Sequence, residues 1–135
     1  MIMNSRKHTI IPLKGTEQLT IGSKRENIKS LFSELYRMTF RRDDNEVDDY
    51  GSFHAYFEND KLCAIEFFEP SEIYFANKQL IGMDFDICRK LFLQYDKDLH
   101  IEGAVGFTST KLQIGVYAPY GTIETVLIAK EGYYK

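Results

Sequence analysis

Several residue types that would define a structural class are scarce in this 135-residue chain. It has no tryptophan, two cysteines, three prolines and three histidines. So few prolines, together with 44% hydrophobic and 27% charged residues, exclude a collagen-like, low-complexity or disordered chain. The apolar runs are short, whereas a membrane-spanning helix needs about twenty apolar residues. The basic N-terminal stretch lacks the apolar segment of a secretory signal peptide, so we expect a cytoplasmic protein without a membrane-bound part.

The cysteines and histidines form no recognisable metal or catalytic pattern. Cys63 and Cys88 lie among apolar residues, which predicts buried, reduced thiols. His8, in the N-terminal tail, His54 and His100 have neither HExxH nor Cys/His zinc spacing. The chain also lacks a G-x-S-x-G elbow and a phosphate-binding glycine pattern. We therefore expect no enzyme activity, no cofactor and no metal site.

Two groups of acidic residues could suggest a cation site, and neither fits one well. In the run that begins at Asp43, Val47 takes a ligand position of a calcium loop and Gly51 comes too late. A second group has the alternate spacing of an extended strand, and we interpret it as a solvated linker between a helix and a strand. It consists of Asp96, Asp98, His100 and Glu102.

An internal repeat organises the chain. TIGSKRENIKSLF at 20–32 matches LIGMDFDICRKLF at 80–92 at an offset of sixty, and FENDKLCAIEFFEP at 57–70 resembles FTSTKLQIGVYAP at 107–119 at an offset of fifty. We interpret the two matches as two tandem β-α-β-β-like repeats, about 9–72 and 73–135, within a single domain that spans 1–135.

Apolar spacing predicts one helix of about three turns in each repeat. Ser23 with Glu26 predicts a capping box for the first helix, and Asp84 predicts the cap of the second. The apolar stripes are Ile28, Leu31, Phe32, Leu35 and Tyr36 in the first helix and Ile87, Cys88, Leu91, Phe92 and Tyr95 in the second.

Alternating residues predict strands at 53–58, 61–68, 73–75, 104–108, 111–118 and 123–129. Because many of these strands follow one another as hairpins, we predict an α+β fold. It would consist of a mostly antiparallel sheet of about six to seven strands with two amphipathic helices covering one face.

Charge is unevenly distributed along the chain, whose net charge is −3. Residues 1–37 hold seven Lys and Arg against three Glu, whereas residues 41–72 hold ten Asp and Glu against three Lys and Arg. An acidic surface repels phosphate, so we expect no nucleic-acid binding, and it attracts a basic protein.

The acidic segment 43–51, placed between the first helix and the first hairpin, has two interpretations. It is either a solvated loop or a preformed partner for Lys and Arg on another protein. Aromatic residues are likewise either exposed interface anchors or sheet-margin side chains with their hydroxyls in water. The candidates are Tyr50, Phe53, Tyr56, Tyr117, Tyr120, Tyr133 and Tyr134.

Four stretches of the chain resemble bacterial proteins encoded beside polymorphic or contact-dependent growth-inhibition toxins. They are IIPLKGTEQLTIG at 10–22, AIEFFEP at 64–70, GFTSTKLQIGVYAP at 106–119 and GYYK at 132–135. The resemblance implies an immunity protein that binds the C-terminal domain of a cognate toxin, here expected to be a nuclease acting on RNA.

Charge and expected exposure point to a partner-binding site made of acidic and aromatic residues. The alternative is an enzyme or small-ligand protein with a pocket around His54, Tyr56 and Glu66. The chain is expected to be a monomer or a weak homodimer. The proposed partner-binding residues are Asp43, Asp44, Glu46, Asp48, Asp49, Tyr50, His54, Tyr56 and Glu66.

Overall fold

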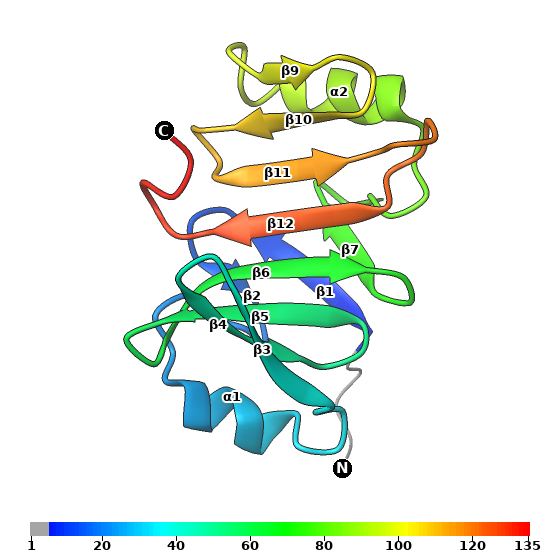
Figure 1. The fold of residues 1–135 in the computed structure, drawn as a ribbon. Coiled ribbons are helices and arrows are strands. Elements are labelled where there is room, and N and C mark those ends of the chain that lie inside the picture. The colour runs from blue at the N-terminus through cyan, green and yellow to red at the C-terminus, as the bar shows by residue number, and fades with distance from the viewer. Residues whose placement is uncertain (1–5) are drawn as a thin grey trace.

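The computed structural model describes residues 6–135, which form two helices and twelve strands (Figure 1). The first half contains β1 (Lys7–Ile11), β2 (Gly15–Thr16), α1 (Arg25–Leu31), β3 (Met38–Arg42), β4 (Asn45–Asp49), β5 (Phe53–Glu58) and β6 (Lys61–Phe68). The second half contains β7 (Glu72–Phe75), β8 (Lys78–Gln79), α2 (Phe85–Leu93), β9 (His100–Glu102), β10 (Gly106–Ser109), β11 (Ile114–Tyr117) and β12 (Thr125–Ala129).

The strands form two sheets. The larger has eight strands in the order β3-β4-β5-β6-β12-β11-β10-β9, and all its neighbours are antiparallel. The smaller has the order β2-β1-β7-β8, and its central pair, β1 and β7, is parallel. The α+β class and the mostly antiparallel pairing are confirmed. The prediction of one sheet with about six to seven strands was wrong, because short strands before each helix form a second sheet.

One face of the eight-stranded sheet is covered. In Figure 1, β1, β2 and β7 lie behind the large sheet, with α1 near its β3 edge and α2 near its β9 edge. Ile28 of α1 and Phe92 of α2 belong to the same buried cluster as Phe53, Phe67 and Ile128 of the sheet. The helices and the small sheet therefore share one hydrophobic core against this inner face.

The hairpin of β5 and β6 shows why strand prediction succeeded there. β5 and β6 have the predicted bounds, and the turn between them places Asn59 and Asp60 at φ of 53° and 60°. Asparagine and aspartate tolerate this left-handed conformation, which suits the twist of a two-residue hairpin.

The helices are shorter than predicted and begin differently. α1 has seven residues and α2 has nine. The Asp84 cap is confirmed, since its carboxylate accepts hydrogen bonds from the backbone nitrogens of Asp86 and Ile87. The Ser23 capping box was wrong, because the N-cap of α1 is Lys24, which makes no side-chain cap bond.

Parts of the predicted apolar stripes do not face the core. Leu31 is 50% exposed and Ile87 60% exposed, because these helices lie across the rim of the sheet. Tyr95, 42% exposed, follows the end of α2. Leu35 and Tyr36 follow the end of α1 but still pack against the core.

The two halves share one element order, ββαββββ, and occupy mirrored positions in the large sheet. Before each helix the chain makes the same contact: Gly22 donates to the Leu62 carbonyl at 2.8 Å, and Gly82 donates to the Ile123 carbonyl at 2.7 Å. The first sequence match, at offset sixty, therefore marks equivalent helix starts. Leu62 corresponds to Ile123 rather than to Leu112, so the second match does not mark equivalent strands. A gene duplication stays a prediction.

Candidate binding face

Strand alternation gives the large sheet a second face, which has polar side chains and a small buried cluster of its own made of Val47, Tyr56, Cys63, Ala64 and Ala129. Phe53, Ile65 and Phe67 point into the core, so their neighbours His54 and Glu66 point the other way. Within residues 6–135, no helix or further sheet covers this outer face, which is turned toward the viewer in Figure 1. It is therefore the sheet surface that remains for contact with another molecule.

A polar cluster occupies the β3–β6 side of the outer face. His54 Nδ1 lies 3.4 Å from Glu66 Oε1, and His54 Nε2 lies 3.5 Å from Asp49 Oδ1. Arg42 donates to the Tyr56 hydroxyl at 2.5 Å and to Glu66 Oε1 at 3.3 Å. We call these five residues the outer polar cluster. It unites four predicted site residues and adds Arg42, which the sequence analysis did not select; the four are Asp49, His54, Tyr56 and Glu66.

The pKa shifts in this cluster keep Glu66 charged and Tyr56 protonated. Contact with His54 is the main cause that lowers the pKa of Glu66, against the effect of burial, and Arg42 lowers it further. Burial raises the pKa of Tyr56 to about 12, with a contribution from Glu66. A general acid needs a raised carboxyl pKa and a tyrosine nucleophile needs a lowered one, so both shifts run the wrong way. The cluster instead holds a fixed negative charge at Glu66.

A shallow groove of about 240 Å³ lies beside the cluster, on the β9–β12 side of the outer face. Glu66 and Glu102 supply its charge, and Tyr117 and Tyr134 supply aromatic surface. Its other lining residues are Gly106, Phe107, Thr108, Gly115, Val116, Thr125 and Leu127. No side chain that lines the groove is basic.

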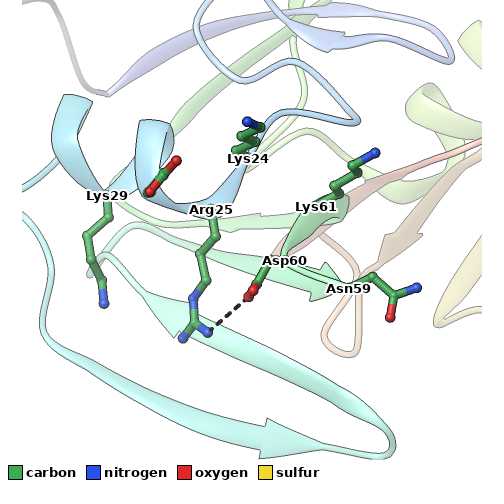
Figure 2. A pocket seen from close by; sticks show the side chains of 7 residues that line it. Lys24, Arg25, Lys29, Asn59, Asp60 and Lys61 are labelled. Atoms are coloured by element: carbon green, nitrogen blue, oxygen red, sulfur yellow. Dashed lines mark ion pairs between the residues drawn. The ribbon is translucent and has the colours of Figure 1, made fainter.

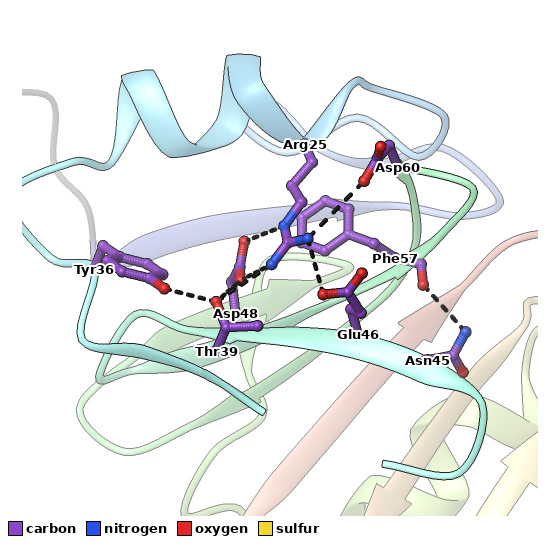
Figure 3. Close-up of polar contacts among 8 residues, drawn as sticks. All are labelled: Arg25, Tyr36, Thr39, Asn45, Glu46, Asp48, Phe57 and Asp60. Atoms are coloured by element: carbon purple, nitrogen blue, oxygen red, sulfur yellow. Dashed lines mark hydrogen bonds and ion pairs between the residues drawn. The ribbon is translucent and has the colours of Figure 1, made fainter. Parts of the chain in front are cut away.

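The acidic segment is a β-hairpin, and the prediction of a loop there was wrong. β3 and β4 pair from Met38–Asp49 to Arg42–Asn45, which turns the acids of β4 to alternate faces. Figure 3 shows Arg25 reaching from α1 to the inner side of this hairpin. Its guanidinium donates to Asp48 at 2.7 and 2.9 Å and to Glu46 at 3.2 Å.

Asp48 is the centre of this network. Its side chain has no exposed surface, and it also accepts a hydrogen bond from Thr39 at 2.6 Å. Burial acts to raise the pKa of Asp48, but the hydrogen bonds from Arg25 and Thr39 outweigh it and the pKa is lowered. Asp48 therefore stabilises the packing of α1 on the hairpin, and its expected place in an exposed acidic loop was wrong.

The structure separates the other predicted binding residues into exposed and buried ones. Asp43 and Asp44 lie exposed at the hairpin tip, and Glu46 is half-exposed. Tyr50 is 1% exposed and stacks on Phe53 at 5.0 Å between ring centroids, so the expectation that Tyr50 is a surface anchor was wrong. Tyr56 is 4% exposed and Phe53 is fully buried, so the expectation that they are exposed anchors was also wrong. Tyr117 and Tyr120 are exposed.

The three histidines have different environments. His8 belongs to β1 rather than to a free tail, and it is buried beside Phe67 at 4.8 Å. His54 lies on the outer face, where Phe40 and Phe68 enclose it edge-on and leave 18% of its side chain exposed. His100 lies on the edge strand β9.

The second acidic group also has a structural role at its first residue. Asp96 is 5% exposed, accepts a hydrogen bond from Ser109 at 2.6 Å and caps the backbone nitrogen of Asp98 at 2.9 Å. The interpretation as a solvated linker was therefore wrong for Asp96, which anchors the chain between α2 and β9.

A larger hollow of about 510 Å³ lies between the start of α1 and the β5–β6 turn (Figure 2). It contains Lys24, Arg25, Lys29 and Lys61 against Glu26 and Asp60, with Asn59 at its rim. Figure 2 shows Arg25 and Lys29 pointing to one side and Lys24 and Lys61 to the other. Since Arg25 is already paired with acids, these cations do not converge on one anion position.

The described part of the chain, residues 6–135, contains no group of three metal-ligating side chains placed to hold an ion. In the same residues no helix is both long and apolar enough to span a membrane. Both cysteines are buried and unpaired. Comparison of the chain with protein-family models, curated proteins and solved structures found no match.

Proposed function

We propose that this chain is an immunity protein that binds the C-terminal domain of a cognate bacterial toxin and blocks its active site. The observation that supports the proposal most is the outer face of the eight-stranded sheet, which presents aromatic and acidic side chains. In residues 6–135 no helix or further sheet covers it, and only the C-terminal Tyr133 and Tyr134 pack on part of it. An antiparallel sheet commonly keeps one face in water, but apolar and aromatic side chains gathered on such a face mark contact sites for other proteins.

The charge of this face favours a basic partner. Asp49, Glu66 and Glu102 lie on it together with one basic residue of the outer polar cluster, Arg42. Asp43 and Asp44 lie exposed at the tip of the β3–β4 hairpin. An enzyme that acts on RNA needs a basic groove to hold phosphates. We therefore propose a ribonuclease toxin, and an immunity protein that acts in the cytoplasm as a monomer or weak homodimer.

Co-expression tests the proposal directly. The chain is produced with the tagged C-terminal domain of the large protein encoded by the gene immediately upstream. We expect the two to co-purify as a stable complex, and the ribonuclease activity of the toxin domain to fall in proportion to the added chain. If the purified partners do not associate, and the toxin domain degrades RNA at the same rate with and without the chain, the proposal is wrong.

A further inference from the structure

The groove on the outer face is produced by two glycines that replace larger residues of the other half. In the first half, Val47 pairs with Tyr56, and in the second half Gly106 pairs with Tyr117. In the first half His54 pairs with Glu66, and at the equivalent position of the second half Gly115 pairs with Leu127. Side chains that fill the sheet surface in one half are therefore missing in the other.

The C-terminal segment forms one wall of the groove and is held in place by a buried side chain. Gln113 is 3% exposed, donates from Nε2 to the Tyr134 carbonyl at 3.0 Å and accepts from the Tyr134 nitrogen at 2.8 Å. The Tyr134 hydroxyl then crosses Gly115 so closely that a Cβ there would lie 2.5 Å from it. Gly115 is thus needed for the position of this tyrosine.

The two carboxylates of the groove differ in their pairing: Glu66 is contacted by Arg42 and His54, whereas Glu102 makes no ion pair with the residues that the structure describes. Glu102 is exposed on β9, and Glu66 contacts Arg42 with one oxygen, Oε1, from outside the groove. The side chain of Tyr134 lines the groove together with both carboxylates, and burial raises its pKa, with further contributions from Tyr133, Glu66 and Glu102. The aromatic faces of Tyr117 and Tyr134 add surface that attracts cations.

We infer that this groove receives a lysine or arginine side chain of the toxin, with Glu66 and Glu102 pairing the charge and Tyr117 and Tyr134 contacting the stem. The inference rests on the proposed function and specifies its contact point. A cationic side chain suits the site because two carboxylates and no base line it, while its volume of about 240 Å³ limits the occupant to a small group. If that side chain is one that binds RNA phosphate in the toxin, its pairing with Glu66 and Glu102 would prevent it from binding RNA.

Three variants test the groove in complex with the upstream-encoded toxin domain. Glu102→Gln removes one charge without changing shape, Thr108→Trp fills the groove, and Glu124→Gln removes an exposed acid that does not line it. We expect Glu102→Gln to weaken binding about ten-fold at low salt with a reduced salt dependence, and Thr108→Trp to weaken it at least as much. Glu124→Gln should bind as the wild type does.

Isothermal titration calorimetry at two salt concentrations gives these affinities, and thermal unfolding shows that each variant is folded. If wild type binds and protects, but Glu102→Gln and Thr108→Trp bind as tightly as Glu124→Gln, the groove is not the contact and only this inference is overturned. If wild type itself does not bind the toxin domain, the proposed function fails and the groove loses its partner with it.

Discussion

At the scale of single residues, the main finding is that a charge pair connects α1 to the acidic hairpin. Asp48 has no exposed side-chain surface, and Arg25 is 18% exposed. A buried carboxylate is tolerated only when its charge is balanced and its oxygens are hydrogen-bonded. Arg25 balances the charge of Asp48, and Arg25 and Thr39 donate hydrogen bonds to its oxygens. The pair therefore matters most when one member is removed.

Replacing Arg25 by methionine should destabilise the protein by about 3 kcal/mol, because it leaves the Asp48 charge buried without a partner. Urea unfolding followed by circular dichroism measures the change. Arg41→Met is the matched control, since Arg41 is exposed on the neighbouring strand β3, and it should change the free energy of unfolding by less than about 0.5 kcal/mol. Equal effects of the two substitutions would contradict the role given to Arg25.

The lowered pKa of Asp48 also predicts a dependence of stability on pH. Because its pKa is lower in the folded state, the stability that Asp48 contributes is complete above the unfolded-state value of about 3.9 and is lost as pH falls through the folded-state value. The gap in unfolding free energy between wild type and Asp48→Asn should thus be largest near neutral pH and shrink below about pH 4. Denaturation curves at several pH values measure the gap, and a gap that stays constant would contradict the prediction. Asp43→Asn, at the exposed tip, should show no such gap.

At the scale of elements, the two helices are equivalent in position but differ in how they begin. α2 begins at Asp84, whose carboxylate accepts from two backbone nitrogens, whereas α1 begins at Lys24 without a side-chain cap. Bridges between Lys24 and Lys61 and between Asp84 and Thr122 fix the two starts in the same way. Backbone pairing therefore positions both helices, and only α2 gains stability from its cap.

Asp84→Ala should lower the free energy of unfolding by about 1 kcal/mol, because it leaves two backbone nitrogens of α2 without their acceptor. Lys24→Ala, the control at the equivalent position of α1, should change it by only a few tenths of a kcal/mol, since no cap bond is lost. Thermal unfolding of both variants makes the comparison. If Lys24→Ala lowered the free energy of unfolding more than Asp84→Ala does, the cap bonds of Asp84 would not be what distinguishes the stability of the two helix starts.

Prediction of elements from sequence succeeded where a single physical rule decided the structure. Strands β5 and β6 followed from alternation and the Asn59-Asp60 turn, and the start of α2 followed from Asp84. The sequence did not predict β3 and β4, because five acids within 43–49 indicate a solvated loop unless a basic residue that balances their charge is known. That counter-charge, Arg25, lies on another element, so only the three-dimensional contact identifies Asp48 as a buried residue.

At the scale of the whole molecule, the outer face could be anticipated only in part. His54 and Glu66 were assigned to the binding site from alternation and charge, and the structure brings them together. Gly106, Gly115 and Tyr134 were not selected, because the groove depends on which strands become neighbours in the large sheet. Strand order results from long-range pairing between the halves, for which a single sequence gives no local signal.

The pairing order also predicts where the protein is most stable. β6 and β12 lie at the centre of the large sheet, pair with each other from Ala64–Ala129 to Phe68–Thr125, and have most of their residues buried. Amides at such positions exchange only through extensive unfolding. Hydrogen exchange should therefore be slowest in β6 and β12 and fastest in the edge strands β3 and β9. The reverse order would show that the seam between the halves, which is the pairing of β6 with β12, opens first.

The same seam has a consequence for a chain cut in two. Each half keeps its own hairpin, helix and four-stranded meander, but its innermost strands, β6 and β1 or β12 and β7, would lose their neighbours. Bare strand edges next to exposed core residues favour association over a free monomer. Fragments 1–70 and 71–135 should therefore reassemble when mixed, so the protein can serve as a split reporter whose signal depends on two chains meeting.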